Sequence, residues 1–268
     1  MDKFEGVPDT LFIPLTARIY VSKRFPEYFY DSKALELESL LPEKNTIAEK
    51  SNEYSMIASA ARYYNMDQMV RDFISKHGKC NIVNLGCGLE TSYFRIGNRD
   101  AVFYEVDLPE VIEGRRKVLG ESENEKLIAG NLFDLKWTEE IKDRSLPTLM
   151  VVAGVFEYFH EEEILDFIKN VRKYFDKLFL IFDATNSTGI KYTIKYVKKT
   201  GNQSAMMYFY IDDAEEFARK CGCRLVEFRP FYRDARKMIG RKTGLYTRIA
   251  MKVCDDTGRA NIVYLDLS

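Results

Sequence analysis

The chain has 268 residues, of which 46% are hydrophobic and 30% are charged, an ordinary composition for a globular protein. Its 40 Lys and Arg residues nearly balance its 41 Asp and Glu residues, and the net charge of −1 argues against a nucleic-acid-binding protein, which needs a basic surface. The longest apolar stretch, residues 146–156, is too short to span a membrane, and the charged first residues do not resemble a signal peptide, so we expect a cytoplasmic protein.

The first 76 residues are predicted to form a helical cap that belongs to the same domain as the core after it. Pro8, Pro14 and Pro26 interrupt any long helix before residue 30, whereas residues 33–41 and 47–75 have helical spacing of apolar side chains. Because these helices precede the first strand, we expect them to cover the carboxyl edge of the sheet. Aromatic residues crowd the first 30 positions and residues 192–232, where core packing and an acceptor pocket are both open interpretations.

Residues 81–107 follow the order strand, glycine turn, helix, strand. The apolar run at residues 82–85 stops at Gly86, and Gly86 and Gly88 allow a sharp turn that brings bare backbone amides close to a ligand. A second apolar run ends in Asp107, 19 residues after Gly88. An acidic residue at about this distance binds a ribose hydroxyl in doubly wound nucleotide-binding folds, so the stretch predicts a nucleoside ligand.

The glycine loop departs from the dinucleotide fingerprint. The position of its third glycine is Thr91, and Glu90 would repel a pyrophosphate. We therefore favour a ligand with a ribose and no phosphate, such as S-adenosylmethionine. Two alternatives stay open: a tight turn without a ligand, and a nicotinamide-dependent oxidoreductase, which only the glycines and Asp107 support.

Alternating strands and helices after Asp107 predict a doubly wound α/β fold with a mostly parallel sheet. Strands are expected at residues 126–129, 149–153 and 178–182, with helices at 109–119 and 161–175 between them. Residues 184–211 are interpreted as an insertion over the sheet edge, with a solvated face of lysines. Two late strands, 224–228 and 246–253, would form an antiparallel C-terminal pair. The core, residues 77–268, thus fits the seven-stranded Rossmann-like sheet of class I S-adenosylmethionine-dependent methyltransferases.

Histidine and cysteine are scarce. The chain has two histidines and five cysteines, and Cys221 and Cys223 lack the two-residue spacer of a zinc pair, so no metal site is predicted. His160 follows the strand at 149–153 and is the candidate general base, with a helix-start or surface role as the alternative. Tyr158 is the candidate contact to the acceptor or to a sulfonium, with core packing as the alternative.

Two runs of residues carry a family resemblance. They are Ile-Val-Asn-Leu-Gly-Cys-Gly-Leu-Glu-Thr at 82–91 and Tyr-Glu-Val-Asp-Leu-Pro-Glu-Val-Ile at 104–112. Together they resemble the leucine carboxyl methyltransferase family, which includes the tetracenomycin-type polyketide O-methyltransferases. Supporting matches occur at 14–18, at Arg62 with Asp67, and at 146–158, so that the resemblance covers roughly residues 10–174.

The resemblance implies where S-adenosylmethionine would bind. Arg18 and Arg62 would approach the carboxylate of its amino-acid tail, which suits the forked donors of a guanidinium. The remaining residues implied for the cofactor are Gly86 and Gly88 in the loop, Asp107 at the ribose, Leu108 beside it, Asn131 and Leu132 at the adenine, and Ala153 near the methyl donor.

One departure from the family leaves the function open. Ala153 stands where many members have a glutamate, which allows a protein that binds the cofactor without catalysis. The resemblance otherwise implies direct displacement of a methyl group onto a hydroxyl or carboxylate of a small-molecule acceptor. A carboxylate is already a nucleophile at neutral pH, whereas a phenol benefits from a base. A protein C-terminal carboxylate, as in the family's eukaryotic members, is the alternative acceptor.

Overall fold

The computed structural model of the protein describes residues 11–41, 46–97, 99–200 and 206–268. The predicted helix break at Pro8 and residues 201–205 of the proposed insertion lie outside these ranges. Within them, no helix combines the length and the apolar character that crossing a membrane requires.

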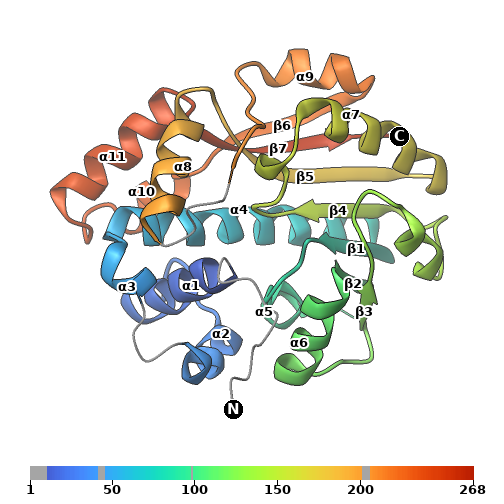
Figure 1. The fold of residues 1–268 in the computed structure, drawn as a ribbon, viewed down its shortest axis with the longest axis horizontal. Coiled ribbons are helices and arrows are strands. Elements are labelled where there is room, and N and C mark those ends of the chain that lie inside the picture. Colours follow the sequence, from blue (N-terminus) through green and yellow to red (C-terminus); the bar gives the residue numbers. More distant parts are fainter. Residues whose placement is uncertain (1–10, 42–45, 98, 201–205) are drawn as a thin grey trace.

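The centre of the fold is a seven-stranded sheet with the order β3-β2-β1-β4-β5-β7-β6 (Figure 1). Strands β1 to β5 run parallel, while β7 lies antiparallel between β5 and β6. The prediction of a mostly parallel sheet with an antiparallel C-terminal pair is therefore confirmed. The strands are β1 (Cys80–Leu85), β2 (Ala101–Asp107), β3 (Glu125–Ala129), β4 (Thr148–Val152), β5 (Leu178–Thr185), β6 (Arg224–Pro230) and β7 (Ala260–Asp266).

Both faces of the central strands are buried, which explains their continuous apolar sequences. In β1, Ile82 packs into one hydrophobic core and Val83 and Leu85 into another. In β4, Leu149 packs into the same core as Ile82, and Met150 packs into the same core as Val83. Each strand therefore separates two helical layers, and its carboxyl end is left as the open edge where a ligand can approach.

The helices and 3-10 turns follow the predicted alternation. The helices are α1 (Phe12–Arg24), α2 (Ser32–Glu36), α3 (Thr46–Lys50), α4 (Glu53–His77), α5 (Ser92–Ile96), α6 (Pro109–Leu119), α7 (Glu161–Val171), α8 (Gly189–Lys199), α9 (Ala214–Cys221), α10 (Arg233–Met238) and α11 (Leu245–Asp256). The 3-10 turns are η2 (Leu37–Leu40), η3 (Lys136–Glu140), η4 (Phe156–Tyr158) and η5 (Arg172–Tyr174).

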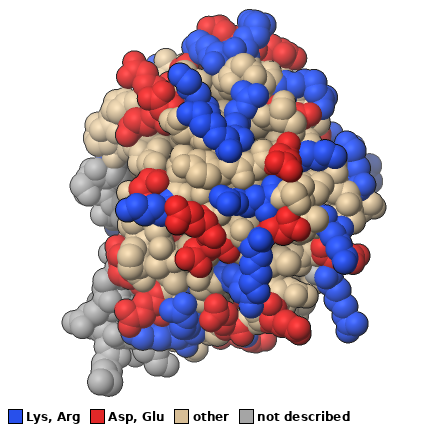
Figure 2. All heavy atoms as spheres, turned by 90° about the vertical axis from the view of Figure 1, so that its right-hand side faces the viewer, with Lys and Arg blue, Asp and Glu red and all other residues tan. Residues whose placement is uncertain are grey.

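On the face shown in Figure 2, Lys and Arg side chains are interspersed with Asp and Glu.

The predicted helix at 47–75 is two helices, because Asn52 caps a new one. Its side-chain oxygen accepts the backbone N–H of Ser55 at 2.9 Å, and the Ser55 hydroxyl accepts the N–H of Asn52 at 3.1 Å. The longer helix, α4, packs against β1, β4 and β7 and shares their core, while α1 to α3 gather near its N-terminal end (Figure 1). The expectation that the whole segment covers the sheet edge is therefore too broad, since much of α4 covers a face of the sheet.

Two late elements differ from the sequence prediction. Residues 246–253, expected as a strand, lie in helix α11, where Thr247, Met251 and Cys254 are buried at spacings of four and three residues. The second strand of the pair is instead β7 at 260–266, which the prediction missed. The β-branched and aromatic residues of segment 246–253 suggested a strand, whereas the buried side chains of this segment have helical spacing.

The segment predicted as an insertion contains an amphipathic helix, α8. Ile190 and Val197 are buried on one side of α8, while Lys191, Lys195 and Lys199 are exposed, in keeping with the predicted lysine face. Helices α8 and α11 lie together above the carboxyl edge of the sheet in the view of Figure 1, with α1 below it. This arrangement surrounds the edge where the site residues are expected.

Candidate active site

A cavity of about 1030 Å³ lies at the carboxyl edge of the sheet. Its walls come from the ends of β1, β2, β4 and β5 and from helices α1, α4, α8 and α11. Every residue expected at the cofactor lines it: Arg18, Arg62, Gly86, Gly88, Asp107, Leu108, Asn131, Leu132 and Ala153. Tyr158 also lines the cavity, whereas His160 is not among the lining residues.

The loop after β1 depends on two glycines. Gly86 and Gly88 have φ angles of +65° and +49°, a region that side-chain-bearing residues rarely adopt. A Cβ on Gly86 would lie 2.5 Å from the side chain of Val155, and one on Gly88 would lie 2.6 Å from that of Leu11. The backbone of this loop therefore lines the cavity without side chains of its own at these two positions. The side chains of Val155 and Leu11 pack closely against it.

Asp107, at the end of β2, presents its carboxylate beside this loop. One oxygen accepts the backbone N–H of Gly88 at 2.8 Å and the other accepts the N–H of Leu108 at 2.7 Å. Burial raises the pKa of Asp107, and the two backbone hydrogen bonds oppose that shift. Each carboxylate oxygen retains further acceptor capacity, which suits a pair of ribose hydroxyls.

The rim after β3 is formed by Asn131 and Leu132. The side-chain oxygen of Asn131 accepts the backbone N–H of Phe133 at 2.9 Å, and the Leu132 carbonyl accepts the indole N–H of Trp137 at 3.1 Å. Both contacts fix the loop. The oxygen of Asn131 that was expected at the adenine thus already has one donor, while the side chain itself is exposed at the rim.

Arg18 is held inside the protein, which revises its expected contact with the cofactor carboxylate. Its side chain is 1% exposed, and its guanidinium donates to Asp31 at 3.0 Å, to the Leu89 carbonyl at 2.7 Å and to Thr91. These partners lie in the cap and in the glycine loop. Arg18 therefore ties the two together rather than offering its terminal nitrogens to the cavity.

A second buried arginine, Arg95, forms ion pairs with three carboxylates. It lies 3.0 Å from Asp31, 2.7 Å from Asp67 and 2.7 Å from Glu90. Burial by itself would raise the pKa of Glu90, but Arg95 and Arg18 outweigh it and hold that pKa below its usual value. The charge of Glu90, predicted to repel a pyrophosphate, is thus compensated inside the protein.

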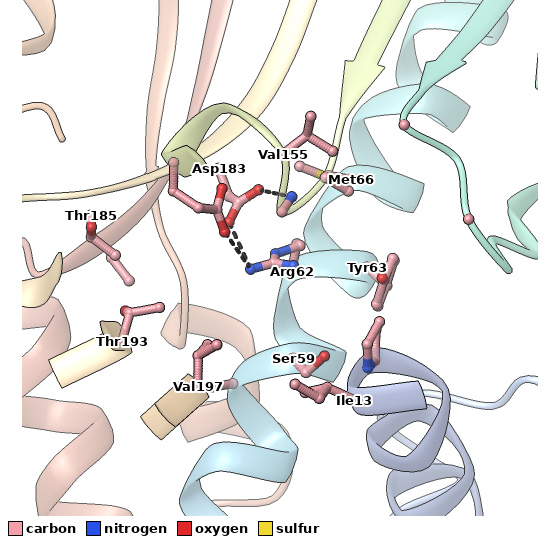
Figure 3. A pocket seen from close by; sticks show the side chains of 18 of the residues that line it. Ile13, Ser59, Arg62, Tyr63, Met66, Val155, Asp183, Thr185, Thr193 and Val197 are labelled. Carbon is pink, nitrogen blue, oxygen red and sulfur yellow. Dashed lines mark hydrogen bonds and ion pairs between the residues drawn. The ribbon is translucent and has the colours of Figure 1, made fainter. Parts of the chain in front are cut away.

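Arg62 has a different setting, on the cavity wall. It projects from α4 toward the end of β5, where its Nη2 atom lies 2.8 Å from Asp183 and 3.9 Å from Glu157 (Figure 3). Its side chain is 20% exposed, and its buried Nε atom has no hydrogen-bond partner among the described residues. Both expected arginines line the cavity, but the side chain of Arg62 is the more exposed of the two.

The two carboxylates beside Arg62 were given no role by the sequence. Asp183 accepts the backbone N–H of Gly154 at 2.7 Å, and both acids line the cavity. Burial and the nearby charge of Asp183 raise the pKa of Glu157 to about 7, against the opposing effect of Arg62. An aspartate at the carboxyl end of a parallel strand, as at Asp183, was the available sequence indication.

Gly154 lets Arg62 reach these acids, and replacing it tests that contact. Its φ is +72°, and a Cβ would lie 2.3 Å from Nη1 of Arg62. We expect Gly154→Ala to lower the free energy of unfolding in urea by more than the roughly 1–2 kcal/mol that a left-handed alanine costs, because Arg62 must also move.

Gly97→Ala is the matched control for this prediction. Gly97 is left-handed, with a φ of +47° and a ψ of +75°, and nothing lies within 4 Å of an added Cβ, so its replacement carries the backbone strain alone. Equal losses for the two variants would contradict the crowding of Arg62 by residue 154.

The two residues predicted to be catalytic are placed differently. Tyr158 lies on the cavity wall, where burial and the charge of Glu157 raise its pKa to about 12, so its hydroxyl is protonated at neutral pH. His160 is exposed at the start of α7, with its ring centroid 4.1 Å from that of Tyr208. This placement gives His160 a helix-start and surface position, and we no longer assign it as the base.

Part of the cavity lining is aromatic. Tyr54 of α4, Tyr192 and Tyr196 of α8 and Tyr246 of α11 line it, and the Tyr196 hydroxyl lies 2.8 Å from that of Ser51. Tyr192 and Tyr246 are 60% and 68% exposed. Several of the crowded aromatic residues therefore line the cavity and its exposed rim, while others fill the core.

The sequence pattern of the leucine carboxyl methyltransferase family matches residues 14–172, more than half of the chain. The chain is also similar to "Tetracenomycin polyketide synthesis O-methyltransferase TcmP" of Streptomyces glaucescens. The two are 24% identical over 198 residues, which cover 73% of this chain and 71% of that protein.

Solved structures share the fold. A DUF574 family protein from Streptomyces avermitilis has a TM-score of 0.61 at 13% identity, with 99% of each chain covered. Magnesium protoporphyrin IX methyltransferase from Synechocystis PCC 6803, crystallised with S-adenosylmethionine, has a TM-score of 0.50 at 11% identity, covering 98% of this chain and 100% of that one.

These similarities confirm three predictions made from the sequence. The fold is the Rossmann-like fold of class I methyltransferases. Membership of the family makes the protein a methyltransferase whose cofactor is S-adenosylmethionine. The glycine loop and Asp107, on which those predictions were based, lie within the matched residues. The chain belongs to the leucine carboxyl methyltransferase family.

Proposed function

We propose that the protein is an O-methyltransferase acting on a small aromatic molecule that enters between α4, α8 and α11. The observation that carries this proposal is the mixed lining of one cavity. It combines the glycine loop and Asp107 with tyrosines of α4, α8 and α11, among them Tyr54, Tyr192 and Tyr246. The name of the Streptomyces glaucescens relative, a polyketide O-methyltransferase, supports an acceptor of this kind.

The residues of the glycine loop and of the strand ends beside it fit S-adenosylmethionine. A side chain on Gly86 or Gly88 would fill the loop, and the Asp107 carboxylate lies beside it with acceptor capacity remaining. Asp107 would hold the ribose, and Leu108, Asn131 and Leu132 would flank the adenine. The cofactor supplies an electrophilic methyl group.

Arg62 is the residue we assign to the carboxylate of the cofactor's amino-acid tail. Its side chain lines the cavity and is 20% exposed, whereas that of Arg18 is 1% exposed. Asp183 holds the guanidinium at 2.8 Å and thus limits its orientations. Alignment of donor and acceptor is the main requirement of a displacement, and positioning can lower its barrier by about 7–11 kcal/mol.

Catalysis is favoured over binding alone because carboxylates reach the site despite Ala153. Glu157 and Asp183 both line the cavity with Ala153, the residue that follows β4 and has no acidic side chain. The absence of the family glutamate is therefore not an absence of acidic groups at this edge.

The cytoplasmic location stays a prediction.

Methyl transfer to two classes of acceptor tests the proposed function. With labelled S-adenosylmethionine, we expect label to enter a panel of polycyclic phenols and aryl carboxylic acids, and not peptides that end in a free leucine carboxylate. Calorimetry with S-adenosylhomocysteine and with NADH is the binding control, since only the former should bind.

Two results would overturn the proposed function. Label that enters only the peptides would show that the acceptor is a protein terminus. Binding of S-adenosylhomocysteine with no transfer to any member of the panel would favour the binding protein without catalysis.

A further inference from the structure

Two acidic side chains on the cavity wall share one arginine unequally. Arg62 lies 2.8 Å from Asp183 but 3.9 Å from Glu157. Asp183 also accepts the Gly154 N–H, so two donors compensate its charge. For Glu157, the only ion pair described is the longer contact with Arg62.

Glu157 is thus the carboxylate with unused capacity to accept a proton. It belongs to η4, directly after β4, and its side chain is 15% exposed on the cavity wall. The groups that act on its charge are Arg62 from α4, Asp183 from β5 and the adjacent Tyr158. From α8, Lys195 and Lys199 line the same cavity.

We propose that Glu157 is the general base that removes the proton from a hydroxyl of the acceptor, an inference that rests on the proposed function. The acceptor oxygen forms its bond to the methyl carbon as its O–H bond breaks and the proton passes to the Glu157 carboxylate. The electron pair of the broken carbon–sulfur bond stays on sulfur, which becomes a neutral thioether. Charge and atoms balance without any further reactant.

A pH profile of Glu157→Gln tests this role. Glu157 acts as a base only when deprotonated, so the wild-type kcat on a phenol from the panel should rise with pH through about 7 and then level off. Since a general base contributes about 10²–10⁴-fold, we expect Glu157→Gln to lose that much in kcat, with KM little changed, and to lose this pH limb. Nitro-substituted phenols, which are already ionised, should lose much less.

A second measurement does not depend on turnover. In protein labelled with ¹³C at the glutamate carboxyl carbons, two resonances should titrate near pH 7, because burial raises the pKa of Glu105 to about 7 as well. The one that belongs to Glu157 should do so in the complex with S-adenosylhomocysteine as well as without it. That resonance should vanish in Glu157→Gln and persist in Glu162→Gln. Glu162 is an exposed glutamate on the first turn of α7, and its replacement should leave the rate unchanged.

The base assignment is overturned if Glu157→Gln keeps the wild-type rate or the pH limb, or if this replacement removes no resonance that titrates near neutral pH. Label that enters aryl carboxylates and no phenol would also overturn it, since a carboxylate is already a nucleophile at neutral pH. Calorimetry separates these failures from failure of the proposed function. If S-adenosylhomocysteine binds the wild type and Glu157→Gln equally, cofactor binding is intact and only the present inference falls.

Discussion

Replacing Arg95 by methionine is expected to lower the free energy of unfolding by about 3–5 kcal/mol, the usual effect of removing one partner from a buried ion pair. Arg95 is 4% exposed and lies within 3.0 Å of Asp31, Asp67 and Glu90. Methionine keeps much of the length of the side chain but none of its charge, so three buried carboxylates lose their shared cation. Urea unfolding at pH 7, followed by circular dichroism, measures the change.

Arg116→Met is the matched control for Arg95. Arg116 is 51% exposed and lies 3.8 Å from Glu121, and exposed pairs contribute at most about 1 kcal/mol. The Arg95 variant should also be less destabilised at low pH, because protonation removes the charges that it leaves unpaired. Similar losses for both variants at pH 7 would contradict a stabilising role for the buried cluster.

The second large effect is expected on ligand binding. Asp107→Ala should weaken the affinity for S-adenosylhomocysteine by about 100-fold, since hydrogen bonds to a charged group are each worth about 1.5–3 kcal/mol. The carboxylate also accepts the N–H groups of Gly88 and Leu108, so the unliganded variant should lose some stability as well. Calorimetry on folded protein separates the two effects.

Asp134→Ala provides the comparison for Asp107. Asp134 also accepts a backbone N–H, that of Lys136 at 3.0 Å, but it is exposed and does not line the cavity. Its replacement should leave the affinity unchanged. An unchanged affinity for Asp107→Ala instead would show that the ribose assignment is wrong.

The part of the site that was predictable is encoded locally. The turn after β1 needs glycines at 86 and 88 because both φ angles are positive, and Asp107 ends the next strand in the chain. Neighbouring parallel strands bring these residues to one edge, so their order in the sequence is enough to place them together.

The cluster of Arg62, Glu157 and Asp183 was not predictable in the same way. Its members come from a helix before the sheet, a turn after β4 and the end of β5. Only the packing of α4 against the sheet brings them together. Arg18 shows the converse, because the same packing turned an expected ligand contact into an internal one.

Helix α11 shows why the end of the fold was misassigned. The apolar residues Tyr246, Ile249 and Val253 are spaced by three and four residues, as in a helix, but their side chains are exposed and line the cavity. The buried residues are Thr247, Met251 and Cys254, and a threonine and a cysteine are weak indicators of a core-facing stripe. The helical period was therefore present in the sequence, but it lay on a stripe that faces the cavity and not the core.

The position of β7 in the sheet has a consequence for how the chain folds. Because β7 lies between β5 and β6, β6 cannot join the sheet until residues 260–266 have been synthesised and have paired with β5. Until then, β5 presents an unpaired edge of alternating Phe, Leu and Ile residues, which is a site for aggregation. We therefore expect closure of this edge to come late in folding, since it joins segments about 80 residues apart and such distant pairings form slowly.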